Sequence, residues 1–134
     1  MQLPELHSHL QKKDLFADFK TQLKKDFEEC NCDIGFVEML KPDFEDIRAR
    51  LATELRLNDK RSLFNLQQLL YRVDIQEKQL SNYLKQHAGE DYLEVVAELI
   101  IKRILQKIVL RNYFSKHEHQ KGHDSGSASH PELD

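Results

Sequence analysis

The sequence predicts an all-α protein, a compact antiparallel bundle of about five helices followed by a disordered C-terminal tail. Leucine occurs 20 times in 134 residues, whereas valine and isoleucine together occur 12 times and threonine twice, a balance that favours helices over strands. Only 4 glycines and 3 prolines are present, too few for the turns of a β-sandwich or barrel. Apolar residues also recur at spacings of three and four, the period of an amphipathic helix.

A single change in composition, near Lys116, divides the chain. Residues 1–116 are expected to form one helical bundle domain. Residues 117–134 read HEHQKGHDSGSASHPELD, and their only aliphatic side chains are those of Ala128 and Leu133. Such a segment cannot bury enough apolar surface to offset its conformational entropy. We therefore expect a disordered, His-rich polar tail.

The charge balance and the apolar runs exclude several classes of protein. The formal net charge is −3 and the pI is near 6.2, which argues against a protein whose main role is to coat nucleic acid. No run approaches the roughly 20 apolar residues of a membrane span, and the first residues lack the apolar block of a secretory signal. We expect a cytoplasmic protein with no membrane partner.

The first part of the chain is expected to hold a long helical region and an irregular stretch. The helical region covers residues 3–29, with Asp14 as a possible cap inside it. Residues 30–42 contain turn-forming side chains and are expected to include at most a short helical turn. Pro42 and Asp43 then open the next helix.

Capping patterns predict two short helices in the middle of the chain. Ser62 is a plausible cap for a helix over residues 62–73. Asp74 and Glu77 have the spacing of a capping box, which predicts a further helix over 75–88.

The last helix is expected to be the longest. Gly89 is placed to end the preceding helix in a left-handed conformation, and Asp91 with Glu94 repeats the capping-box spacing before a helix over residues 92–115. The residues expected in the core are Phe16, Phe19, Leu23, Phe27, Ile47, Leu51, Leu66, Leu70, Leu84, Val96, Leu99 and Ile100.

The apolar face of this last helix changes side halfway along. At 100° per residue, the apolar residues of its first half centre on one direction, and those of its second half centre nearly opposite. Either the helix is central and changes neighbours, or another chain covers the second half. The second alternative predicts a partner surface at Ile101, Ile104, Leu105, Ile108 and Val109.

No catalytic motif is recognisable, so we expect a non-catalytic domain with no cofactor. Its function is expected to be protein–protein association, with a homodimer as the favoured form, because exposed apolar faces usually mark partner surfaces. Cys30 and Cys32 form a C-x-C pair that could contribute to a metal site, but two thiols are fewer than the three or four ligands such a site needs. The alternative for these thiols is that they are small buried apolar groups.

Two polar patterns leave nucleic acid open as a partner. The predicted helices 62–73 and 75–88 resemble a helix-turn-helix in arrangement, although their connection lacks the usual glycine. The second would show side chains suited to bases and phosphates, namely Gln76, Lys78, Gln79, Ser81, Asn82 and Lys85. Arg103, Lys107 and Arg111 form a basic stripe that could contact an acidic partner or stabilise the helix C-terminus.

Overall fold

The computed structural model describes residues 3–61 and 64–120. All regular secondary structure in these residues is helical, and they contain no strand. The all-α prediction is therefore confirmed. The elements are α1 (Leu3–Gln11), α2 (Lys13–Glu28), the 3-10 helix η1 (Gly35–Met39), α3 (Phe44–Asn58), α4 (Leu66–Val73), α5 (Glu77–Gln86) and α6 (Tyr92–Gln120). The predicted tail falls mostly on residues 121–134, outside the described residues, and α6 includes 117–120. None of the described helices is both long and apolar enough to cross a membrane.

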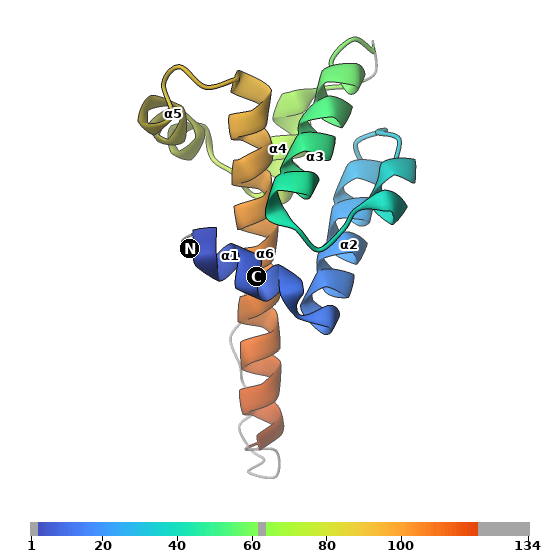
Figure 1. The fold of residues 1–134 in the computed structure, drawn as a ribbon, viewed down its shortest axis with the longest axis vertical. Coiled ribbons are helices and arrows are strands. Elements are labelled where there is room, and N and C mark those ends of the chain that lie inside the picture. The colour runs from blue at the N-terminus through green and yellow to red at the C-terminus, as the bar shows by residue number, and fades with distance from the viewer. Residues whose placement is uncertain (1–2, 62–63, 121–134) are drawn as a thin grey trace.

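Helix α6 is the centre of the bundle and packs against each of the other five α-helices (Figure 1). Its most extensive contact is with α3, and α2, α5, α4 and α1 surround the rest. Val96 and Ile100 in its first half and Ile104 in its second half are all fully buried. Of the two alternatives that the sequence left open, the structure therefore has the central helix that changes neighbours. The C-terminal end of α6 extends past the other helices (Figure 1).

Helices α1 and α2 are separate, whereas the sequence left them as one helical region. Lys12 has extended backbone angles (φ −82°, ψ 123°), and this single residue turns the chain. Helix α1 then crosses α6, which brings its Leu6 and Leu10 into the core (Figure 1). Asp14 lies within the first turn of α2 and is not its N-cap.

The irregular stretch and the start of α3 follow the prediction. Helix η1 is the expected short helical turn, and its Phe36 and Val37 are buried. Asp43 is the N-cap of α3, where its carboxylate accepts a hydrogen bond from the backbone N–H of Asp46 at 3.0 Å. The cap satisfies one of the N–H groups that a helix start leaves free.

Two predicted caps are wrong. Helix α4 begins at Leu66 and not near Ser62, which lies outside the described residues. Asn65 is its N-cap, and its side-chain oxygen accepts hydrogen bonds from the backbone N–H groups of Gln67 and Gln68. Asp74 does not open α5. It ends α4 in a left-handed conformation (φ 73°), and α5 starts at Glu77 after a residue that gives no side-chain cap.

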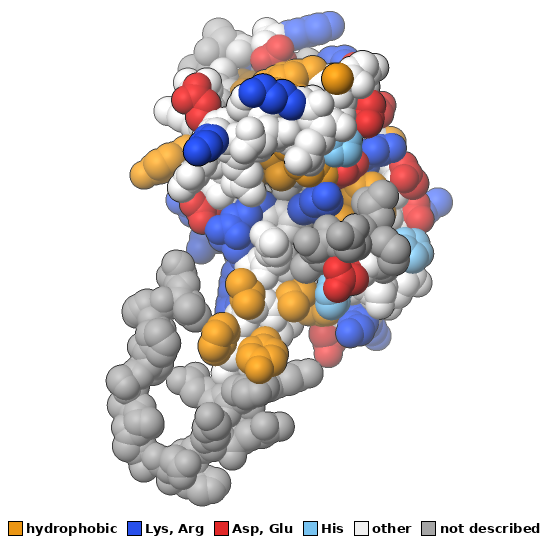
Figure 2. Space-filling model, turned by 90° about the vertical axis from the view of Figure 1, so that its left-hand side faces the viewer, with side chains coloured by type: hydrophobic (Ala, Val, Ile, Leu, Met, Phe, Trp, Pro, Cys, Tyr) orange, Lys and Arg blue, Asp and Glu red, His pale blue; other side chains and the backbone are white. Residues whose placement is uncertain are grey.

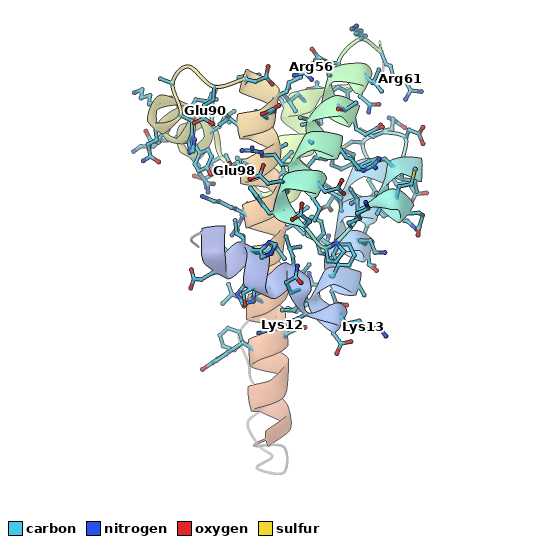
Figure 3. The ribbon with its side chains drawn as sticks, viewed as in Figure 1. Lys12, Lys13, Arg56, Arg61, Glu90 and Glu98 are labelled. Carbon is cyan, nitrogen blue, oxygen red and sulfur yellow. The ribbon has the colours of Figure 1, made fainter. Side chains whose placement is uncertain are left out.

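The turn before α6 is as predicted. Gly89 has φ +91°, a conformation that glycine adopts without strain. Asp91 caps α6 by accepting from the backbone N–H of Glu94 at 3.1 Å. The same carboxylate pairs at 2.8 Å with Arg56, which ties the end of α3 to the start of α6. Figure 3 shows Arg56 and Arg61 at this end of the bundle, far from Lys12 and Lys13 at the junction of α1 and α2.

The core contains most of the residues that the sequence assigned to it. Phe16 and Leu66 are only partly buried but pack against the core cluster, whereas Leu84 is partly exposed and lies outside that cluster. Leu84 was placed wrongly because α5 lies at the edge of the bundle and buries none of its residues.

The central position of α6 predicts unequal effects for two similar truncations. Ile104→Ala removes a fully buried side chain and should lower the free energy of unfolding by about 2–5 kcal/mol. Leu110→Ala, on the same helix but 53% exposed, should change it by less than about 0.5 kcal/mol. Urea denaturation of both variants measures the difference, and equal effects would contradict the described packing of α6.

Candidate functional site

The predicted partner surface on α6 is part of the protein's own core. Ile101, Ile104, Leu105 and Ile108 are at most 1% exposed, and Val109 is half-buried. Placing this face open to another chain was therefore wrong. The physical reason is that the other helices of the same chain pack against α6 and cover these side chains, which belong to the core cluster.

The basic stripe of α6 is engaged by the same chain. Arg103 pairs with the carboxylate of Asp74 at 2.5 Å, and Lys107 donates to the backbone oxygen of Val73 at 3.5 Å. These cations therefore lie at the C-terminus of α4, where the helix dipole favours positive charge. Arg111 donates to the side-chain oxygen of Gln22 on α2 at 3.1 Å. The stripe joins α6 to α4 and α2.

The polar face predicted for the second short helix is exposed. Helix α5 packs against α6, and its Leu80, Tyr83 and Leu84 are only partly buried. The six side chains that could contact nucleic acid all face solvent: Gln76, Lys78, Gln79, Ser81, Asn82 and Lys85.

Cys30 and Cys32 are buried in the core as small apolar groups. The thiol of Cys32 donates to the backbone oxygen of Cys30 over 3.8 Å. Burial raises the pKa of both thiols, that of Cys32 to about 11. A thiol that keeps its proton is a poor metal ligand, because the thiolate is the binding form. Within the described residues, no three His, Cys, Asp or Glu side chains are grouped so that they could hold a metal.

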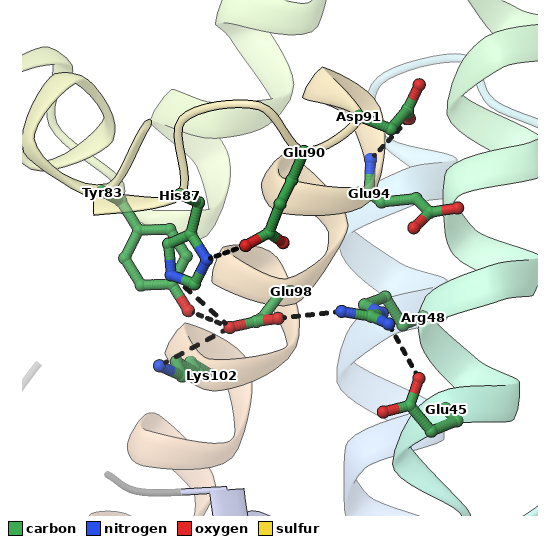
Figure 4. A network of polar contacts seen from close by, with 9 residues as sticks. All are labelled: Glu45, Arg48, Tyr83, His87, Glu90, Asp91, Glu94, Glu98 and Lys102. Atoms are coloured by element: carbon green, nitrogen blue, oxygen red, sulfur yellow. Dashed lines mark hydrogen bonds and ion pairs between the residues drawn. The ribbon is translucent and has the colours of Figure 1, made fainter. Parts of the chain in front are cut away.

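Glu98 is the centre of a polar network where α3, α5 and α6 meet (Figure 4). Its side chain is buried, yet four other side chains reach its carboxylate. The Tyr83 hydroxyl donates to one oxygen, and Arg48 donates to the other at 3.2 Å. Lys102 and His87 lie 3.8 and 4.0 Å away. Charged and hydrogen-bonded partners offset the cost of burying this carboxylate.

The same network holds α5 against α6. The ring of His87 stacks on that of Tyr83 with 4.4 Å between centroids, and its Nδ1 lies 3.1 Å from a Glu90 oxygen. Lys102 lies over the face of the Tyr83 ring at 4.7 Å. Burial and the hydrogen bond to Glu98 raise the pKa of Tyr83, so the phenol keeps its proton and acts as the donor. These groups satisfy one another and lock the helices together.

Sequence reasoning missed the burial of Glu98, although a signal was present. Glu98 points away from the apolar face of the first half of α6. Around the helix axis, Glu98 lies on the same side as the apolar residues of the second half of α6. Those residues are buried in the structure. An acid within an apolar arc indicates a buried carboxylate.

Asp26 is a second buried carboxylate, located between α2 and α4. One oxygen accepts from Gln22 at 3.1 Å and lies 3.4 Å from Arg72. The other oxygen is buried and has no hydrogen-bond partner among the described residues. Burial raises the pKa of Asp26, and the Gln22 amide and the nearby cations counteract the rise only in part. Its position three residues after the buried Leu23 was the available sequence signal.

Large apolar side chains are exposed at the projecting end of α6. Leu110, Tyr113 and Phe114 are 53%, 52% and 43% exposed, and their spacing of three and four places them on one side of the helix. We call them the α6 end surface. Figure 2 shows apolar side chains gathered at this end of the molecule, below the region of α5.

A shallow groove lies between α4 and α5. Its volume is about 360 Å³, and we call it the α4–α5 groove. The lining residues are Gln67, Leu70, Tyr71, Asp74, Ile75, Gln76, Glu77 and Leu80. A second hollow of about 350 Å³ shares Glu77 and Leu80 and continues along α5 to Lys85.

The unpartnered oxygen of Asp26 predicts a pH-dependent effect of Asp26→Asn. Because its pKa is raised above the unfolded value near 3.8, the carboxyl is best tolerated while protonated, and stability is lost as the pH rises through the folded-state pKa. Asparagine stays neutral and still accepts from Gln22. The variant should therefore gain stability relative to the native chain as the pH rises from about 4 to 8.

Urea unfolding across this pH range measures the gain, and Asp18→Asn at an exposed position of α2 is the matched control. A gap between variant and native chain that stays constant or shrinks with rising pH would contradict the prediction.

The comparisons with known proteins add no information to this geometry. The chain matches no protein-family model, no curated protein and no solved structure.

Proposed function

We propose that this protein is a non-catalytic domain that binds another protein chain through the α6 end surface. The observation that carries the proposal is the exposure of Leu110, Tyr113 and Phe114 on a helix that extends past its neighbours (Figures 1 and 2). Large apolar side chains that gather on a protein surface mark interaction sites. Their spacing is the one by which a helix presents anchors to a groove in its partner.

The buried polar groups support association over catalysis. A general acid or base must be within reach of a reactant. Glu98 is 5% exposed, and its oxygens are bonded to Tyr83 and Arg48 of the same chain. The groups with the strongest polar contacts therefore serve to hold helices together, whereas the α6 end surface is accessible.

A photo-crosslinker at the α6 end surface tests this proposal. Replacing Tyr113 of the full chain by p-benzoylphenylalanine should give a covalent adduct with another protein chain after irradiation in the native cell. The same replacement at Tyr92, which is 47% exposed at the opposite end of α6, should give none. Absence of an adduct at Tyr113, or equal adducts at both positions, would contradict the proposal.

DNA binding through α5 is a second candidate function, favoured by the exposure of the six polar side chains on that helix and at its N-cap. Lys78 and Lys85 would then contact phosphates. Lys78→Glu and Lys85→Glu should each weaken binding. Each should also lower the slope of log affinity against log salt concentration by about one, the share of one phosphate contact, while the helical circular-dichroism signal stays unchanged. Failure of the native chain to bind duplex DNA even at low salt in a fluorescence-anisotropy titration would rule this candidate out.

A further inference from the structure

One side of α5 carries a stripe of side chains that this chain leaves partly uncovered. Helix α5 lies at the edge of the bundle and packs mainly against α6 (Figure 1). Glu77, Leu80, Ser81, Leu84 and Lys85 line the hollow of about 350 Å³ along this helix. They recur at spacings of three and four, so they lie on one side of α5, and we call them the α5 stripe. Its two leucines are only partly buried, and Leu84 lies outside the core cluster.

The two charged residues of the α5 stripe have opposite signs and lie at its two ends. Glu77 is in the first turn of α5, and Lys85 is in its last turn. Both side chains are exposed, and neither forms an ion pair or hydrogen bond with another described residue. The helix dipole favours these signs at these ends, but it does not account for the two leucines between them.

The α5 stripe is complementary to itself in an antiparallel arrangement. Glu77 precedes Ser81 by four residues and Lys85 follows it by four, so a half-turn about an axis at Ser81 places each glutamate opposite the lysine of the other copy. With a rise of about 1.5 Å per residue, the four leucines of two such helices lie at levels about 3 Å apart and alternate between the copies. The small side chain of Ser81 lies at the axis, where the two helices are closest.

We propose that the α5 stripe binds the α5 stripe of a second copy of this chain, in a two-fold dimer whose α5 helices are antiparallel. The charge pattern favours a second copy over an unrelated chain, because each copy supplies both the opposite charges and the apolar side chains that the other requires. The α5 stripe is separate from the α6 end surface, so this inference does not rest on the proposed function. One short helix from each copy makes the contact, and the dimer is therefore weak.

Charge reversal tests the pairing of Glu77 with Lys85. In sedimentation equilibrium at up to hundreds of micromolar, the mass of the full chain should rise with concentration from 15.9 kDa toward twice that value. Glu77→Lys and Lys85→Glu should each raise the dissociation constant at least about tenfold, because the symmetry makes each substitution act at two contacts. A mixture of the two single variants should associate again, since one then carries two cations and the other two carboxylates. The double variant should dimerise as the native chain does.

Two truncations locate the contact. Leu84→Ala should weaken the dimer, whereas Leu110→Ala on the α6 end surface should leave it unchanged. All of these side chains are at least partly exposed, so every variant should keep the native circular-dichroism spectrum.

Three results would overturn the inference. The first is a native chain that stays monomeric at the highest concentration, and the second is a mixture of single variants that associates no more tightly than either variant alone. The third is a dimer lost with Leu110→Ala but not with Leu84→Ala, which would place the contact on the α6 end surface and support the proposed function instead. The photo-adduct of Tyr113 tests the proposed function separately from all three.

Discussion

The whole bundle depends on one constraint: the apolar face of α6 changes side along the helix, so other helices must cover α6 on opposite sides. A helix with a single apolar face can lie on the surface, but a helix whose apolar face changes side must lie inside. Five short helices surround α6, and each covers only part of its circumference. The break at Lys12 follows from this demand, because a continuous helix through α1 and α2 could not both run beside α6 and cross it.

Several short helices pack around α6, and polar groups become buried where two or three of these helices meet. Glu98 lies at the boundary of three helices and is compensated by partners from all of them. Asp26 lies at another boundary and is compensated at only one oxygen. Apolar packing between helices tolerates sliding, whereas a buried carboxylate with fixed partners does not. Glu98 therefore specifies the position of α5 relative to α3, which few apolar contacts could do at the edge of the bundle.

The sequence was sufficient for the fold class, because helix class depends on local periodicity and composition. The caps at Asp43 and Asp91 could also be predicted, since the donor and acceptor are three residues apart. Ile104 and Ile108 could not be assigned to an intrachain core, because their covering residues are remote in sequence and periodicity does not identify them. The role of Asp74 was reversed for a related reason: a side chain that can open one helix can also end the previous one, and the partner Arg103 lies 29 residues away. The α4–α5 groove has no sequence signal, since it exists only when two helices are placed side by side.

The position of α5 has a consequence for the order in which the molecule opens. No residue of α5 is buried, and it is bounded by left-handed residues, Asp74 on one side and Gly89 on the other. Elements with few buried contacts open at a lower free energy than the core that they cover. Helix α5 is therefore the first helix to open once its contacts with Glu98 are broken, while α2, α3 and α6 remain packed. Amide hydrogens of α5 would then exchange before those of α6, and proteases would cut the flanking turns first. Helix α5, which forms one wall of the α4–α5 groove, is thus the part of the bundle that unfolds at the lowest free energy.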